Sequence, residues 1–205
     1  MAQNILFVNS SARGDHSESK QLAEAILKRI TDGSPDAKVT RLDVATDLPP
    51  AVDMNWIMGA YTPPESHDEG ARAAMAKSDE YVNQLLAADT LVLAVPMYNF
   101  NVPASFKLWL DQIVRIGRTF SPSYEGLAKG KKAYIASARG GGGYGSGQQM
   151  ESIDYLTPYL RFILGFVGIT DVTILDIENT ISANENYQAT KGRAFENVEA
   201  IVVEA

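Results

Sequence analysis

The sequence has no cysteine among its 205 residues, and it also lacks long apolar runs and clusters of basic residues. Without thiols there are no disulfides, thiolate metal ligands or cysteine nucleophiles, which excludes cysteine-dependent phosphatases. No metal site is indicated, and no apolar stretch is long enough to cross a membrane. The net charge of −7 and the missing basic patch argue against nucleic-acid binding. Because Met1 to Ile5 carry no basic leader, we expect a cytoplasmic protein.

The apolar residues follow two patterns that alternate along the chain. Short apolar runs typical of buried strands occur at 5–8, 39–42, 90–95, 133–137 and 172–175. Helical spacing of apolar residues occurs between and after them, at 22–30, 64–86, 106–114, 148–167 and from about 184. This alternation predicts a single α/β domain over 1–205 with a flavodoxin-like, doubly wound sheet. Its five parallel strands would have the order 2-1-3-4-5, with helices on both faces.

The segment 43–64 has no clear periodicity and is too long for a simple connection. Its apolar residues between 56 and 61 argue against disorder, so we expect this irregular segment to pack over a site or against a partner. Trp56, Trp109 and Tyr61 are interpreted as either packing residues or substrate contacts.

Three unusual loops follow the first, third and fourth predicted strands, where doubly wound sheets bind ligands. The first loop, 10–19, is rich in hydroxyls and precedes a helix, whose free amides and dipole stabilise a phosphate. Ser17 and Ser19 are therefore either phosphate ligands or helix N-caps. No lysine occupies the position that a P-loop requires, so hydrolysis of a nucleoside triphosphate is not indicated.

The second loop, 96–103, places Met97, Tyr98, Asn99 and Phe100 where a buried strand ends. Aromatic and sulfur surfaces suit the face of a flat, partly polar ring, and an amide side chain suits its heteroatom edge. The alternative is a loop that plugs the core with Met97 and Phe100.

The third loop contains Gly140 to Gly145 and formally matches G-x-G-x-x-G. A dinucleotide fingerprint belongs to the first βαβ unit and has an acidic residue about twenty positions later. Here the motif lies in the fourth unit, and the residues at that spacing, 163–166, are apolar. We therefore reject a Rossmann site. The glycines are interpreted as allowing backbone amides to approach a ligand edge, or as keeping the loop mobile.

With these loops placed, the sequence resembles the FMN-dependent NADH-azoreductases, a family also described as quinone reductases. The resemblance extends from about Ile5 to Ile201, and Met-Tyr-Asn-Phe at 97–100 is its most discriminating piece. The other matching pieces are Ser10-Ser11, Ser17-x-Ser19, Lys131-Lys-Ala133, Arg139-Gly-Gly141, 157–160 and 164–171.

The resemblance implies a tightly bound FMN in contact with three sets of residues. These are Ser11, Ser17, Glu18 and Ser19 at the phosphate, Met97, Tyr98, Asn99 and Phe100 at the isoalloxazine, and Ala138, Arg139, Gly140 and Gly141 at the pyrimidine edge. Phe166 would lie near the acceptor. The family usually has a serine at the position of Ala138. Its members are homodimers with FMN sites at the subunit interface, so the same assembly is implied here.

By this resemblance, NADH, or NADPH, would pass a hydride to the flavin and leave. A quinone or azo compound would then accept two electrons in the same pocket, which predicts ping-pong kinetics. No side chain is identified as a catalytic acid. The alternatives are a flavodoxin-type electron carrier, which turns over no small substrate, and a cofactor-free hydrolase.

Several charged residues carry open interpretations. Arg139 either neutralises flavin charge or is an ordinary surface arginine on a glycine loop. Asp111, Arg115 and Arg118 are expected along a solvated or interfacial helix edge. His16 could assist an anionic phosphate or be a solvated loop histidine.

Overall fold

The computed structural model describes residues 2–182 and 184–202. One parallel sheet has the strand order β2-β1-β3-β4-β5, which confirms the predicted flavodoxin-like arrangement. Its strands are β1 (Asn4–Asn9), β2 (Lys38–Asp43), β3 (Thr90–Ala94), β4 (Lys132–Ala138) and β5 (Asp171–Ile177). The central strands β1 and β3 are buried along nearly their whole length because their runs are apolar on both faces.

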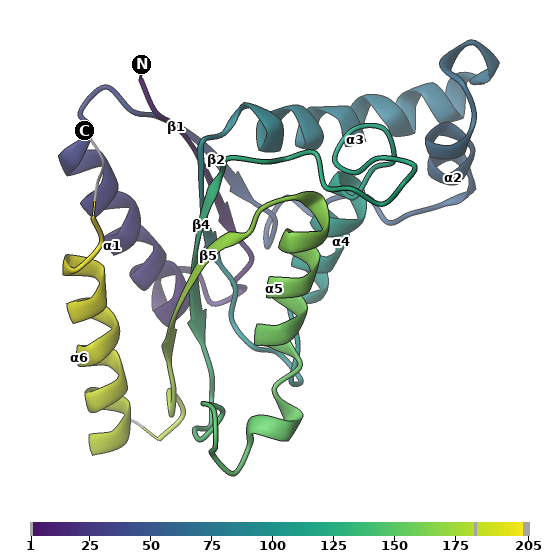
Figure 1. The fold of residues 1–205 in the computed structure, drawn as a ribbon. Helices are drawn as coiled ribbons and strands as arrows, with labels where there is room; N and C mark the ends of the chain where they lie inside the picture. The colour runs from purple at the N-terminus through teal and green to yellow at the C-terminus, as the bar shows by residue number, and fades with distance from the viewer. Residues whose placement is uncertain (1, 183, 203–205) are drawn as a thin grey trace.

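Helices cover both faces of the sheet (Figure 1). On one face lie α1 (Glu18–Gly33) and α6 (Glu185–Glu199). On the other lie α3 (Glu69–Ala87), α4 (Ala104–Ile113) and α5 (Leu156–Val167). Each helix follows a strand by a crossover, so α4 and α5 start at the carboxyl edge of the sheet and run back toward its amino edge. The chain segments at that carboxyl edge are the predicted site loops.

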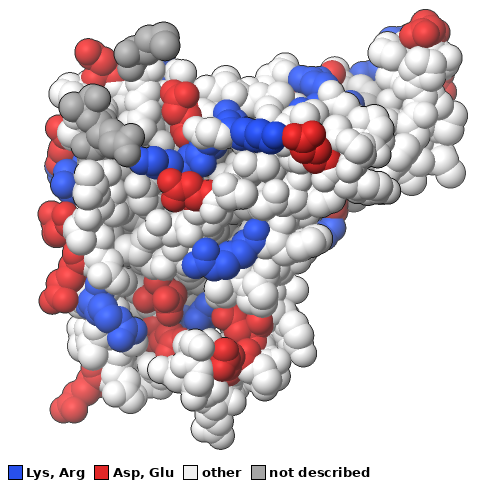
Figure 2. Space-filling view, viewed as in Figure 1, with Lys and Arg blue, Asp and Glu red and all other residues white. Residues whose placement is uncertain are grey.

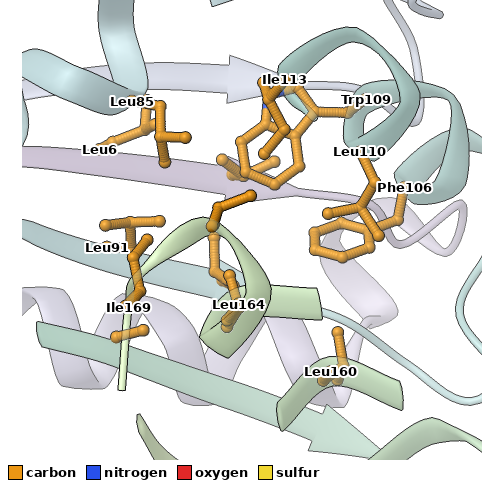
Figure 3. Packing of buried hydrophobic residues seen from close by; sticks show 14 of the residues in the cluster. Leu6, Leu85, Leu91, Phe106, Trp109, Leu110, Ile113, Leu160, Leu164 and Ile169 are labelled. Atoms are coloured by element: carbon orange, nitrogen blue, oxygen red, sulfur yellow. The ribbon is translucent and has the colours of Figure 1, made fainter. Parts of the chain in front are cut away.

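The larger core cluster lies between the sheet and the helices α3, α4 and α5 (Figure 3). Leu6 and Leu91 of the sheet meet Trp109 of α4 and Leu164 of α5 there, all fully buried. Burying an aliphatic or aromatic side chain of this size contributes roughly 1.5–3 kcal/mol. Trp109 is therefore a packing residue, which decides between the two interpretations given for it.

The segment 43–64 is not irregular throughout, because it contains the helix α2 (Met54–Tyr61). The Asp53 side chain caps this helix by accepting a hydrogen bond of 2.8 Å from the Trp56 amide. The pattern concealed α2 because it is only eight residues long and apolar on several sides. It packs against α3 and forms an arm at the end of the molecule (Figure 1).

Under this arm lie Trp56 and Arg115, and the structure decides between the interpretations given for each. Trp56 is buried and donates from Nε1 to Gln112 Oε1 at 3.0 Å, so it is a packing residue. Of the two positions expected for Arg115, a solvated and an interfacial helix edge, the solvated one is wrong. The Arg115 side chain is only 9% exposed, and its Nη1 donates to Ser78 Oγ at 2.7 Å.

Two predicted helices begin later than their apolar spacing suggests. The helix predicted from 148 starts at Leu156, after a short 3₁₀ turn at Glu151–Ile153. Asp154 Oδ1 accepts from the amide of Thr157 at 3.0 Å, which fixes the start of α5. The helix predicted from 64 starts at Glu69, where Asp68 is the cap. Among 2–182 and 184–202, no helix combines the length and the apolar character needed to cross a membrane.

Candidate functional site

A hollow of about 200 Å³ opens at the carboxyl edge of the sheet. We call it the edge hollow. Residues within 11–19, 96–98 and 138–140 line it, so the three loops predicted to meet do come together. The fourth wall, Thr180 and Ile181, follows β5 and was not predicted. Its position was available in principle, because β5 ends beside β4 in the expected strand order.

The start of α1 provides the hydroxyl side of the edge hollow. Ser17 is the N-cap: its Oγ accepts from the Lys20 amide at 3.0 Å and lies 3.2 Å from Ser19 Oγ. Both serines are 1% exposed. The first amides of a helix have no partner within it, and the dipole adds positive potential at this end. Capping and anion binding are therefore compatible here, because the cap satisfies only the Lys20 amide and both serines still line the hollow.

Two more residues of the first loop complete this side. Ser11 is buried, and its amide donates to Asn9 Oδ1 at 3.1 Å, which fixes the loop to the end of β1. Arg13 lines the edge hollow and adds a positive charge. Arg13 was not singled out in the sequence, although an arginine within a serine-rich loop before a helix is a feature that could have marked it.

Glu18 also lines the edge hollow, but its carboxylate is engaged with α6. Tyr187 donates to Glu18 Oε1 at 2.6 Å, and Lys191 Nζ lies 2.8 Å from Oε2. Burial acts to raise the pKa of Glu18, but the hydrogen bonds from Lys191 and Tyr187 and the nearby positive charges outweigh it and lower the pKa. Glu18 is thus a charge already neutralised by the protein, which limits its repulsion of an anion in the hollow.

Replacing Glu18 by glutamine is expected to reduce the free energy of unfolding by about 1 kcal/mol at neutral pH. The lowered folded-state pKa means that the ionised carboxylate contributes fully above its ordinary pKa of 4.5 and loses that contribution as the pH falls further. The difference between wild type and E18Q should therefore be constant from pH 6 to 8 and shrink below about pH 4.5. Urea unfolding at several pH values measures this. E24Q on the same helix, which loses an exposed ion pair with Arg41, is the control. A difference independent of pH would contradict the expectation.

A strained turn forms the other side of the site. The amide and carbonyl groups of Tyr98 and Asn101 pair with each other at 2.9 and 3.1 Å, and the two residues between them have positive φ, 47° at Asn99 and 70° at Phe100. A phenylalanine in this region costs on the order of 1 kcal/mol or more. The turn is also tied to the first loop, because the Ala12 amide donates to the Tyr98 hydroxyl at 3.3 Å.

The four predicted ring contacts divide into two pairs. Met97 and Tyr98 line the edge hollow, whereas Asn99 and Phe100 lie outside it and are exposed. Met97 also packs against the main core, so the alternative of a core plug holds in part for Met97. It does not hold for Phe100, which is 46% exposed. The strained turn therefore presents an aromatic side chain to solvent at the mouth of the hollow.

The glycine loop is held against the segment after β5 by Glu178, a residue not predicted to act. Glu178 Oε2 accepts from the Gly143 amide at 2.8 Å, and Oε1 accepts from the Tyr144 amide at 3.1 Å. The Asn179 amide donates to Gly141 O at 2.9 Å, and any side chain at Gly142 would collide with Asn179. The amides of Gly143 and Tyr144 thus anchor the glycine loop itself. Gly140 and Ala138 remain at the wall of the edge hollow.

Of the two interpretations given for Arg139, that of an ordinary surface arginine is wrong, because Arg139 is 4% exposed. Its guanidinium contacts Glu178 at 3.3 Å and Asp154 at 3.1 Å, and it lies over the Tyr144 ring at 5.2 Å. Burial raises the pKa of the neighbouring Asp176, which the charge of Arg139 opposes. The side chain of Arg139 thus serves a buried ionic cluster behind the glycine loop.

Phe166 does not reach the edge hollow of its own chain. It lies in the last turn of α5, toward the amino edge of the sheet, and its ring is 4.9 Å from that of Phe120. Tyr124 and Phe162 complete this aromatic cluster, with ring centroids 6.4 and 6.2 Å from Phe166. Tyr124 is 74% and Phe162 66% exposed, so the cluster presents aromatic surface to solvent.

The comparisons with known proteins agree with this architecture. A family model described as a flavodoxin-like fold matches residues 3–199. An FMN-dependent NADH:quinone oxidoreductase 2 of Trichormus variabilis is 44% identical over 179 residues, which cover 86% of each chain. An FMN-dependent NAD(P)H:quinone oxidoreductase 1 of Pseudomonas aeruginosa is 37% identical over 205 residues, covering 96% of this chain and 97% of the relative.

A solved structure of an azoreductase from Bacillus anthracis is 27% identical, with a TM-score of 0.83, and covers 97% of this chain and 100% of its own. The match therefore extends over nearly the whole chain. The chain belongs to the flavodoxin-like family of FMN-dependent NADH:quinone oxidoreductases and azoreductases.

Proposed function

We propose that this protein is an FMN-dependent NAD(P)H oxidoreductase that reduces quinones and azo compounds by two-electron transfer. The observation that carries the proposal is the edge hollow, where the hydroxyl-lined start of α1 faces the Met97-Tyr98 end of a strained aromatic turn. One side suits a phosphate and the other suits a flat ring, and FMN combines these two groups.

The charges and size of the hollow fit FMN. Arg13, the α1 dipole and the hydroxyls of Ser11, Ser17 and Ser19 favour a phosphate, while the Glu18 carboxylate is paired with Lys191. A volume of about 200 Å³ is below the ~300 Å³ or more of typical small-molecule sites. We therefore assign the hollow to the phosphate and sugar chain, and the mouth beside Asn99 and Phe100 to the ring.

At the pyrimidine edge, we propose contacts from the backbone of Ala138 to Gly141. Ala138 and Gly140 line the hollow, and Gly140 has no side chain to block a close approach. The Arg139 side chain is buried in its ionic cluster, so only its backbone is assigned to this edge.

Bound in this site, FMN supplies two-electron chemistry, with NADH or NADPH as hydride donor and a quinone or azo compound as acceptor. We assign donor and acceptor to the same opening, beside the exposed residues Asn99 and Phe100, where they would bind in turn with ping-pong kinetics. The titratable side chains that line the hollow are Arg13, Glu18 and Tyr98. Glu18 is paired with Tyr187 and Lys191, and the Tyr98 hydroxyl accepts from the Ala12 amide while keeping its own hydrogen. We assign the proton to water, which an open mouth admits.

We further propose a homodimer with FMN sites at the subunit interface. Phe166 and its aromatic neighbours lie at the amino edge of the sheet, so they can contact an acceptor only in the site of a partner. The apolar residues Met54, Ile57, Met58 and Tyr61 of α2 are 42–71% exposed, an unusual face for a monomer. A partner bound at this face would also cover the part of the edge hollow that its own chain leaves open.

The purified protein should be yellow, elute at twice the mass of the chain, and bleach anaerobically with NADH or NADPH. Adding a quinone or an azo compound should restore the flavin spectrum in the same sample. Failure to bleach would remove the reductase function and leave FMN binding intact, while a colourless protein that does not take up FMN would remove both.

An electron carrier is the weaker alternative. Such proteins usually present a strongly acidic partner surface, whereas acidic and basic side chains are interspersed over the face shown in Figure 2. The relatives named above are oxidoreductases that act on quinones. We place the reaction in the cytoplasm, where NAD(P)H is available.

A further inference from the structure

A second hollow, of about 590 Å³, lies under the arm, between α2, α3 and the segment after α4. We call it the arm hollow. Its lining includes Arg72, Arg115, Arg118 and Asp79, together with the apolar residues Met75 and Ile116. It shares no lining residue with the edge hollow, and the function proposed above assigns it no role.

The charges of the arm hollow do not balance. Arg118 Nη1 lies 2.6 Å and Arg115 Nη1 lies 3.6 Å from the same Asp79 oxygen, so one carboxylate serves two guanidinium groups. Arg72 donates to the backbone carbonyl of His67 and forms no ion pair with any residue of 2–182 or 184–202. Three arginines and one aspartate leave two positive charges in a chain whose net charge is −7.

A second observation indicates a missing acceptor. Arg115 is 8% exposed, and its Nε is a buried donor without a hydrogen-bond partner. Buried polar groups in proteins are nearly always hydrogen-bonded, so an orphaned guanidinium nitrogen is unusual. Burial also lowers the pKa of Arg115, with a further contribution from the neighbouring charge of Arg118, while Asp79 opposes both. Burial is the largest of these effects, so Arg115 is a cation held where water solvates it poorly.

We infer that the arm hollow binds an oxyanion of the phosphate class with two negative charges. Guanidinium groups are the usual ligands for such ions because their planar donors bind two oxygens at once. Two uncompensated positive charges match a phosphate dianion. The apolar wall formed by Met75 and Ile116 also allows the phosphate to belong to a larger organic molecule.

Free phosphate and a phosphate group of the nicotinamide nucleotide are the two sources of this chemistry. The second source rests on the proposed reductase function and on the homodimer. Ile116 and Arg118 belong to the same segment as Phe120, whose ring contacts Phe166. A partner site that uses the aromatic cluster would therefore also lie near the arm hollow.

The test compares Arg72→Gln with Arg29→Gln in the FMN-loaded protein, so that the edge hollow is occupied. Arg72 is exposed and Arg29 is half-buried, each donates to a backbone carbonyl, and Arg29 lies outside both hollows, so the two variants lose the same charge without loss of the core. Inorganic phosphate is titrated by calorimetry and by thermal unfolding, against sodium chloride at equal ionic strength. We expect saturable phosphate binding in wild type and R29Q, and binding about tenfold weaker in R72Q, the loss of one charge-assisted contact. Arg72→Lys should recover part of the affinity.

Phosphate that acts no better than chloride, or equal binding by R72Q and R29Q, would overturn the inference without affecting anaerobic bleaching by NADH. The source is decided by steady-state kinetics with a neutral quinone. If R72Q raises the KM for NADPH or NADH and leaves kcat and the quinone KM unchanged, the anion belongs to the nucleotide. If inorganic phosphate binds and both KM values stay constant, the site takes free phosphate.

Discussion

Replacing Glu178 by leucine is expected to lower the free energy of unfolding by about 3–5 kcal/mol. The carboxylate is the hydrogen-bond acceptor for the amides of Gly143 and Tyr144 and for the Arg139 guanidinium, at 2.8, 3.1 and 3.3 Å. Leucine fills a similar volume but accepts nothing, so the buried Tyr144 amide and the half-buried Gly143 amide lose their acceptor, and Arg139 loses one acidic partner while it keeps Asp154 at 3.1 Å. A buried donor without an acceptor costs about 1–3 kcal/mol, and more when it is charged.

Urea unfolding measures this loss, and Glu80→Leu is the matched control. Glu80 forms an exposed ion pair with Lys77 on α3, so the same chemical change there should cost less than about 1 kcal/mol. Glu178→Gln should fall between the two, because its single amide oxygen can accept only part of the three bonds. Equal stabilities for E178L and E80L would mean that the glycine loop does not depend on Glu178.

The variant has a second expected effect, on the cofactor. Asn179 to Ile181 bond to the backbone of 139–141, and Thr180, Ile181 and Gly140 are walls of the edge hollow. Loss of the Glu178 carboxylate should therefore weaken FMN binding even at temperatures where E178L remains folded. Flavin fluorescence at low denaturant separates this effect from global unfolding.

The parts of the fold that were predicted correctly depend on local patterns. Apolar runs such as Thr90 to Ala94 are long enough to mark a buried strand, and their alternation with helical spacing restricts the topology to few choices. The meeting of three loops followed from that topology alone, because parallel strands end at one edge. Asp53 and Asp68, which begin α2 and α3, could have corrected the helix limits, since both are residues typical of an N-cap.

The parts that could not be predicted depend on contacts between distant residues. Glu178 and Arg139 are 39 positions apart, and nothing near either of them indicates that a buried ionic cluster joins them. Arg115 has the sequence surroundings of a surface helix end, and its burial follows only from where the arm packs. Phe166 could be assigned to an acceptor by resemblance, but its distance from the edge hollow depends on the direction of α5 across the sheet.

The second large effect concerns the phosphate side of the edge hollow. Replacing Ser19 by aspartate is expected to weaken FMN binding by about a thousandfold or more. Ser19 is 1% exposed beside the hollow, and two unit charges about 4 Å apart repel by about 4 kcal/mol at the effective dielectric of a protein surface. At about 1.4 kcal/mol for each factor of ten, one negative charge on the phosphate already gives this loss.

The same substitution should not destabilise the protein without its cofactor. Ser19 lies in the first turn of α1, where a carboxylate interacts favourably with the helix dipole, and the hollow provides room for the added atoms. Flavin fluorescence titration measures the affinity, and Ser19→Ala, which removes a hydroxyl but adds no charge, should lose only about tenfold.

Riboflavin provides the decisive control, because it carries the same ring and sugar chain without the phosphate. Wild type, S19A and S19D should bind riboflavin with nearly equal, weak affinity, so the thousandfold effect should appear with FMN alone. If S19D weakens riboflavin as much as FMN, the substitution has distorted the hollow. If it weakens neither, the phosphate lies elsewhere, and the Ser11, Ser17 and Ser19 hydroxyls act as helix caps and loop contacts only.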